Sequence, residues 1–248
     1  MNSGPTTLEN RLAIRTRPDG TNIGHMNWGK LLFMHWRVPV AALRPLVPER
    51  LTIDTHEGEA WVGIVPFTMW DVRPSYTPAI PGLSEMHELN VRTYVHYEGV
   101  PGVWFMSMDC NSLVAVRGAR TFFHLPYYDA EMSLEEHGRT VEYSSRRTHG
   151  DAPPAEFRAS YTYGEATGHA APDSLDFFLT ERYCLYSEHE GELYRLRIHH
   201  QKWPLRTATA VVHRSNLLEA LGLPTPSGEP LLHYANAIEV DVWPLVRV

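Results

Sequence analysis

Apolar and polar residues alternate along much of the chain with a period of two, the pattern of strands that bury one face. In residues 88–97 the odd positions from Leu89 to Tyr97 are mainly apolar, and the even positions from Glu88 to His96 are mainly polar. Strands of the same kind are predicted over residues 60–70, 103–109, 121–132, 139–147, 155–163, 193–200 and 237–243. About eight or nine strands separated by turn signals indicate an antiparallel barrel or sandwich.

Only a few segments have helical signals. A helix over residues 174–186 is predicted after Asp173 as N-cap, and a short one over 216–221 after Ser215. A third is predicted over 39–46, where a proline suits the first turn. We therefore expect a mainly β fold with two or three short helices. No repeat or linker divides the sequence, so one domain over residues 1–248 is predicted.

Composition and charge narrow the class of protein. The chain has 248 residues, a formal net charge of −7 and no basic stripe, which argues against nucleic-acid binding. Its two cysteines, Cys110 and Cys184, fit no zinc spacing, and reduced structural thiols are expected. The N-terminal segment is polar and no apolar run approaches a membrane span. A soluble, cytoplasmic protein without membrane or nucleic-acid partners is expected.

Familiar catalytic and cofactor motifs are absent from the sequence. It contains no HExxH, P-loop, GxGxxG or GxSxG pattern. A metal site from His35, His87, His124 and one of the adjacent pair His199 and His200 is imaginable, but the 14 histidines follow no ligand spacing. We expect no metal and no cofactor.

The polar face of residues 88–97 is the strongest candidate for a site. It presents Glu88, Asn90 and Arg92 at alternate positions, together with Tyr94 and His96. Such a face meets solvent in an ordinary antiparallel sheet. Inside a barrel, the same carboxylate and guanidinium would line a ligand cavity. The alternation alone leaves both interpretations open.

A second candidate lies in residues 111–129, where Arg117 and Arg120 precede the run from Phe122 to Pro126. Two guanidinium groups beside an apolar run could clamp a carboxylate, for which their planar fork is suited. They could equally pair with acids on the surface.

The stretch from residue 85 to 128 resembles the acetoacetate decarboxylase superfamily, and the whole chain resembles its uncharacterised YqjF-like branch. The resemblance rests on SEMHELNVRTYVHYEG, on the small-residue segment 111–116, and on GARTFFHLPYYDAEM. When Pro126 is placed on the family's motif proline, Arg120 falls on the motif arginine and Glu88 near the active-site glutamate. Branch-level similarity extends to MNWGKLLFMHWRVPVAALRPLVP, LDFFLTERYCLYS and LYRLRIHHQKWPL.

The departures from this family concern its nucleophile. Where the decarboxylases carry two adjacent lysines after the proline, this chain has Tyr127 and Tyr128, and His124 replaces the motif glycine. In the family, the first lysine forms a Schiff base with a β-keto acid. Tyrosine forms no imine, and Lys30 and Lys202 are the only lysines in the sequence. The resemblance therefore implies the fold without the family's decarboxylation.

The resemblance implies a conical, mostly antiparallel β-barrel that holds a small molecule, in a superfamily whose members commonly form homo-oligomers. On that frame Glu88, Tyr127 and His124 are the candidate acid–base residues, and Arg92, Arg120 and Asn90 are the candidate ligand-binding residues. Arg120 would hold either the motif loop or a ligand anion.

Three functions remain open on this basis. The first is an enzyme that acts on an organic acid or ketone by acid–base chemistry without imine formation. The second is a non-catalytic binding protein for a small apolar or carboxylate ligand. The third is a scaffold whose barrel is filled by its own aromatic side chains, and a cavity of ligand size would exclude it.

Overall fold

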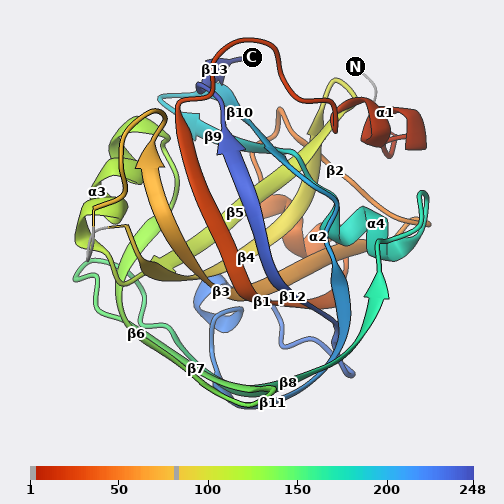
Figure 1. Cartoon of the computed structure of the whole chain (residues 1–248). Helices are drawn as coiled ribbons and strands as arrows, with labels where there is room; N and C mark the ends of the chain where they lie inside the picture. The colour runs from red at the N-terminus through yellow and green to blue at the C-terminus, as the bar shows by residue number, and fades with distance from the viewer. Residues whose placement is uncertain (1–3, 81–83) are drawn as a thin grey trace.

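The computed structural model describes residues 4–80 and 84–248, and within them thirteen strands form one sheet (Figure 1). The strands are β1 (Gly24–Val38), β2 (Thr52–Ile53), β3 (Ala60–Pro74), β4 (Met86–Tyr97), β5 (Val100–Cys110), β6 (Tyr127–His137), β7 (Thr140–Arg147), β8 (Glu156–Gly168), β9 (Cys184–His189), β10 (Glu192–His200), β11 (Leu205–Ser215), β12 (Leu231–Val242) and β13 (Val246–Arg247). The described helices are α1 (Leu8–Ala13), α2 (Val40–Leu43), α3 (Leu113–Phe122) and α4 (Leu175–Thr180), with 3-10 turns η1 (Arg44–Leu46) and η2 (Glu219–Leu221). The prediction of a mainly β fold is confirmed.

The sheet closes on itself in two rings, because β5 pairs with β4 as well as β6 and β9, and β12 pairs with β1, β10 and β11. The first ring runs β4–β5–β9–β10–β12–β1–β3 and back to β4. The second leaves β5 through β6, β7, β8 and β11 and rejoins at β12. In Figure 1 these four strands form a layer along the bottom of the molecule. The predicted barrel is thus the first ring, and a second, curved layer of the same sheet is packed against it.

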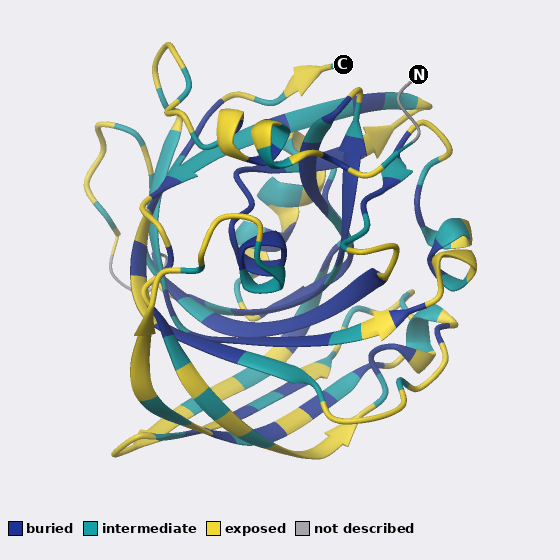
Figure 2. Cartoon of the chain, turned by 90° about the vertical axis from the view of Figure 1, so that its right-hand side faces the viewer, coloured by how far each residue is buried: buried dark blue, intermediate teal, exposed yellow. Residues whose placement is uncertain are grey.

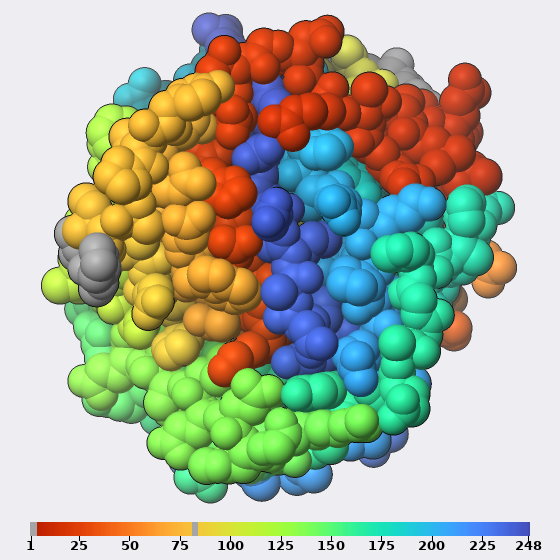
Figure 3. Space-filling view, in the orientation of Figure 1, coloured from red at the N-terminus to blue at the C-terminus, as the bar shows by residue number. Residues whose placement is uncertain are grey.

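Strand β5 is the branch point on one side. Its residues Val103 and Trp104 lie parallel to the start of β9, whereas Met108 to Cys110 lie parallel to the start of β6. The other strand pairings are antiparallel. Figure 3 shows β1 and β12, from opposite ends of the chain, side by side across the front of the molecule.

Strand β4 is largely buried on both faces, so its consecutive residues belong to two different cores. On β4, Leu89 and Val91 belong to the core inside the second ring, together with Tyr143 and Phe157 from the outer layer. Neighbouring positions face the first ring. Figure 2 shows this as nearly continuous dark blue along the central strands, whereas the outer strands below them are banded with yellow. The alternation that predicted half-buried strands therefore separates side chains that face one core from side chains that face the other.

Two predicted segments are wrong in type. Residues 121–132 were expected as a strand, but α3 continues to Phe122 and β6 begins only at Tyr127. His124, between them, has a φ of 54°, a left-handed conformation that breaks the strand. In the predicted helix 174–186, α4 ends at Thr180 and the chain re-enters the sheet at β9.

The predicted starts of the helices are more accurate than their predicted lengths. The N-cap of α4 is Ser174, whose hydroxyl accepts from the Phe177 amide at 3.1 Å, and not the predicted Asp173. The segment 39–46 forms α2 and η1 with Pro39 as N-cap. The segment 216–221 contains only η2, ended by Gly222 in the left-handed region. No described helix is long and apolar enough to cross a membrane.

Candidate active site

A cavity of about 500 Å³ lies inside the first ring. Its walls are mainly apolar side chains of β1, β3, β4, β5, β9, β10 and β12, and α3 covers one side. A volume of this size is in the range of sites that hold a small organic ligand. The barrel is therefore not filled by its own aromatic residues, which excludes the scaffold hypothesis.

Strand β4 directs three predicted residues into this cavity. Glu88, Asn90 and Arg92 all line it, as their period-two spacing requires. Glu88 and Asn90 are buried, with 2% and 3% of their surface exposed. The polar face of β4 thus lies in the lumen of the barrel and not in solvent.

Tyr127, the first residue of β6, lines the same cavity and contacts Glu88. The parallel pairing of β5 and β6 sets Tyr127 opposite Met108, and Glu88 pairs with Cys110 on the other edge of β5. From there the Tyr127 hydroxyl donates a hydrogen bond to Glu88 Oε2. Asn90 Nδ2 donates to Oε1 of the same carboxyl at 3.2 Å.

Burial dominates the electrostatics of this pair. It raises the pKa of Glu88 to about 7, against the opposing effects of the Tyr127 and Asn90 hydrogen bonds and the Arg92 charge. Burial and the neighbouring carboxylate raise the pKa of the Tyr127 phenol well above 10. Near neutral pH, Glu88 is therefore present in both its protonated and its ionised form, whereas Tyr127 keeps its proton.

Three guanidinium groups line the cavity beyond this pair, and one of them, Arg73, is paired with Asp71. Arg92 lies 5.3 Å from the Phe33 ring centre, and its Nη2 donates to the Leu179 carbonyl at 3.3 Å. Arg182, which follows α4, is held by Asp54 at 3.0 Å and by the Phe178 carbonyl at 2.8 Å. Arg182 was not predicted as a site residue, because residues 174–186 were predicted to form a helix.

Several polar atoms that belong to cavity-lining residues are buried without a hydrogen-bond partner among the described residues. They are the donors Arg92 Nε, Arg182 Nη2, Trp28 Nε1 and Trp203 Nε1 and the acceptor Asn90 Oδ1. Unpaired buried polar groups are costly, so they typically mark places where a ligand or water is bound. Four donors against one acceptor suit a ligand rich in acceptor oxygens.

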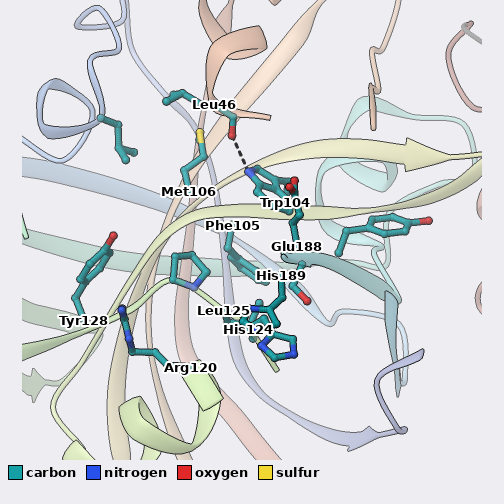
Figure 4. A pocket seen from close by; sticks show the side chains of 14 residues that line it. Leu46, Trp104, Phe105, Met106, Arg120, His124, Leu125, Tyr128, Glu188 and His189 are labelled. Carbon is teal, nitrogen blue, oxygen red and sulfur yellow. Dashed lines mark hydrogen bonds between the residues drawn. The ribbon is translucent and has the colours of Figure 1, made fainter. Parts of the chain in front are cut away.

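The structure separates the remaining two candidates from the cavity. His124 and Arg120 line a different hollow of about 430 Å³, located where β6 and β9 diverge from β5 (Figure 4). Within it, His124 stacks on His189 with ring centres 4.1 Å apart. The family resemblance grouped His124 with Tyr127, since His124 stands at the motif glycine, but the left-handed turn at His124 places its ring in this second hollow.

Arg120 contacts the site through the backbone. Its Nη1 donates to the Tyr127 carbonyl at 2.8 Å, which ties the end of α3 to the first residue of β6. Of the two roles expected for Arg120, the structure provides the contact that holds the motif loop. Phe105 and Leu125 line both hollows and form the wall between them.

Neither lysine lies on the cavity lining. Lys30 pairs with Glu136 at 2.9 Å, and Lys202 is exposed. In the described ranges, no group of three or more His, Cys, Asp or Glu residues could hold a metal ion. The described polar groups of the cavity lining therefore include one carboxyl, one phenol, one amide, one imidazole, from His200, and three guanidinium groups.

The fold is that of the acetoacetate decarboxylase-like enzymes. An acetoacetate decarboxylase-like enzyme from Sphingomonas wittichii RW1 superposes with a TM-score of 0.64 at 14% identity, over 92% of this chain and 94% of that one. The enduracididine biosynthesis enzyme MppR, complexed with pyruvate, gives 0.63 at 12% identity, over 94% and 92% of the two chains.

Within this fold, the chain belongs to the DUF2071 family of uncharacterized conserved proteins, whose profile matches residues 25–239. The uncharacterized protein YqjF of Bacillus subtilis strain 168 is 45% identical to it over 228 residues, which cover 92% of this chain and 93% of the relative. The resemblance inferred from the sequence motifs is confirmed.

Proposed function

We propose that the protein is an enzyme that moves a proton at carbon next to the carbonyl group of a small keto acid. The observation that carries this proposal is the buried hydrogen bond from Tyr127 to Glu88 inside a ligand-sized cavity. A general base works best when its pKa lies near the working pH, and burial brings the pKa of Glu88 to about 7.

In the proposed step, the Glu88 carboxylate takes a proton from the carbon beside the ketone. The C–H electron pair becomes a C=C bond, and the carbonyl π electrons move onto oxygen to give an enolate. Protonated Glu88 no longer needs the Tyr127 hydrogen bond, so the phenol can donate to the enolate oxygen instead. Return of the proton to carbon restores the keto acid and the carboxylate.

In this proposal, the guanidinium groups of Arg92 and Arg182 bind the carboxylate of the keto acid. Arg92 Nε and Arg182 Nη2 are buried donors without a partner among the described residues. Charge-assisted hydrogen bonds from such groups are about twice as strong as neutral ones, and they orient a planar carboxylate. The pyruvate bound to MppR supports a keto acid as the class of ligand.

Imine formation has no part in this proposal. The family's lysine position carries Tyr127, and Lys30 and Lys202 are absent from the cavity lining. Tyr127 hydrogen-bonds the carboxyl that would act as base, so the tyrosine supports acid–base chemistry in place of a Schiff base.

Proton exchange in D₂O tests the proposal. Pyruvate and 2-oxooctanoate are incubated with the protein near neutral pH, and loss of the proton signal beside the ketone is followed by NMR. The wild type is expected to accelerate exchange, and Glu88→Gln to lose roughly 100-fold or more, the usual contribution of a general base. Glu131→Gln, a change at an exposed residue of β6, serves as the control and should leave the rate unchanged.

Three outcomes would count against the proposed function or its mechanism. They are equal rates for wild type and Glu88→Gln, an imine adduct trapped by borohydride and located by mass spectrometry, and binding of keto acids without any exchange. The last would favour the non-catalytic binding protein. Circular dichroism of Glu88→Gln separates loss of the base from loss of the fold.

A further inference from the structure

The cavity opens to the surface between α3 and the chain near Ile23 and Pro74. Among its lining residues, Ile23, Pro74, Val114 and Phe122 are exposed. Phe122 exposes 72% of its surface, and Val114 67%. Large apolar side chains at the entrance of a cavity are unfavourable in water unless they contact something apolar that passes between them.

Helix α3 presents one continuous apolar stripe to this opening. Val114, Gly118 and Phe122 are four residues apart and share one face of the helix. Gly118 is the narrow point of the stripe, and a Cβ added there would meet no atom within 4 Å. Among the described residues, the space beside Gly118 is therefore free, and the side chains around it are apolar.

The polar groups of the cavity are arranged in order behind this opening. Glu88 pairs with Cys110, just before α3, whereas Arg92 pairs with Phe105, further along the barrel. The four residues from Glu88 to Arg92 span about 13 Å of strand. The order from the surface inward is thus an apolar entrance, the Glu88–Tyr127 pair, and the guanidinium groups of Arg92 and Arg182.

We infer that the ligand is a medium-chain carboxylic acid, bound with its carboxylate at Arg92 and Arg182 and its hydrocarbon chain running outward along α3. This inference rests on the proposed function and narrows its substrate to keto acids that carry an extended apolar chain. The cavity of about 500 Å³ and its mainly apolar walls have room for such a chain. A short acid such as pyruvate fills only part of this volume.

A chain-length series tests this inference apart from catalysis. Butanoate, hexanoate, octanoate and decanoate have no ketone and cannot react, so calorimetric titration with them reports binding alone. The wild type is expected to bind one molecule, with affinity rising about fourfold for each added CH₂ group. Equal affinity across the series, or a decline with length, would overturn the inference.

Two variants locate the bound acid. Gly118→Leu fills the free space beside α3 and should abolish the gain for the longer acids while leaving butanoate unaffected. Gly150→Leu is the matched control, since a Cβ there also meets no atom within 4 Å and the residue lies outside the cavity lining. Arg92→Gln should weaken all four acids by the same factor. An unchanged chain-length dependence in Gly118→Leu would also overturn the inference.

The two proposals fail separately. If the chain-length series succeeds but Glu88→Gln exchanges protons as fast as the wild type, the protein binds medium-chain acids without the proposed chemistry. If exchange depends on Glu88 but affinity does not change with the chain length of the acid, the proposed function stands and this substrate class is wrong.

Discussion

Glu88 keeps its proton to a higher pH in the folded protein than in the unfolded chain, because burial in the apolar barrel disfavours the carboxylate. Between its usual pKa of 4.5 and the folded value of about 7, the folded state holds a proton that the unfolded state has lost. This group's contribution to the free energy of unfolding therefore decreases as the pH rises through that window, and above pH 7 ionised Glu88 destabilises the fold.

Glu88→Gln removes this titration, so its stability should change less with pH than that of the wild type. From pH 5 to pH 8 the free energy of unfolding of the wild type is expected to fall relative to the variant by up to about 3 kcal/mol. Urea unfolding at both pH values measures the difference. Parallel pH dependence of the two proteins would contradict the raised pKa.

At the residue level, the sequence predicted the strand positions in the site better than the turn positions. Glu88, Asn90 and Arg92 follow from strand alternation, because a period of two fixes which side chains share a face. Arg182 could not be found, since its direction depends on where α4 ends. His124 lies in a different hollow from Tyr127, because it occupies a left-handed turn that strand alternation does not indicate.

The junction of α3 and β6 is the element that positions the site. Arg120, in the last turn of α3, donates to the carbonyl of Tyr127, and the hydroxyl of that tyrosine donates to Glu88. We therefore treat Arg120 as a positioning residue, which sets the start of β6 without touching the cavity.

Arg120→Ala should lower the exchange rate about tenfold or more, because small misplacements of a catalytic group are costly. The Tyr127 hydrogen bond lowers the pKa of Glu88, so its weakening should also move the midpoint of the pH–rate profile upward. Arg117→Ala on the same helix is the control, since Arg117 pairs with Asp129 on the surface. A slower rate with an unmoved midpoint would indicate a purely structural role.

Local patterns predicted most strands but neither of the two switches between helix and strand. Phe122, Phe123 and the following apolar residues suit a strand as well as a helix, and short apolar runs leave that choice to tertiary contacts. The same ambiguity extended the predicted helix past Thr180 into β9.

At the scale of the whole molecule, the sheet encloses one core that is solid and one that is hollow. The solid core lies in the second ring, where Leu89 packs with Tyr143 and Phe157. The hollow core lies in the first ring, where Leu31 lines the cavity. Sequence patterns predicted a barrel but not the second ring, because its closure depends on two short pairings, β5 with β6 and β11 with β12, that strand alternation does not indicate.

Leu89→Ala and Leu31→Ala compare the two cores, since both leucines are buried on strands that the rings share. Leu89→Ala should cost roughly 2–5 kcal/mol, as a new void opens in close packing, and should leave octanoate binding unchanged. Leu31→Ala should cost about 2 kcal/mol or less, because its neighbours already border a void, but should change octanoate affinity. Urea unfolding and calorimetry measure both. Equal effects on binding would contradict the separation of the cores.

The two-sided burial of β4 has a consequence for how such proteins diverge. Adjacent positions of β4 have different surroundings: Leu89 and Val91 pack in the core of the second ring, whereas Glu88, Asn90 and Arg92 line the cavity. A lineage can thus exchange the ligand-facing set through successive point mutations while the other set preserves the architecture. New ligand specificity then arises by substitutions at alternate positions of β4, and the fold is kept.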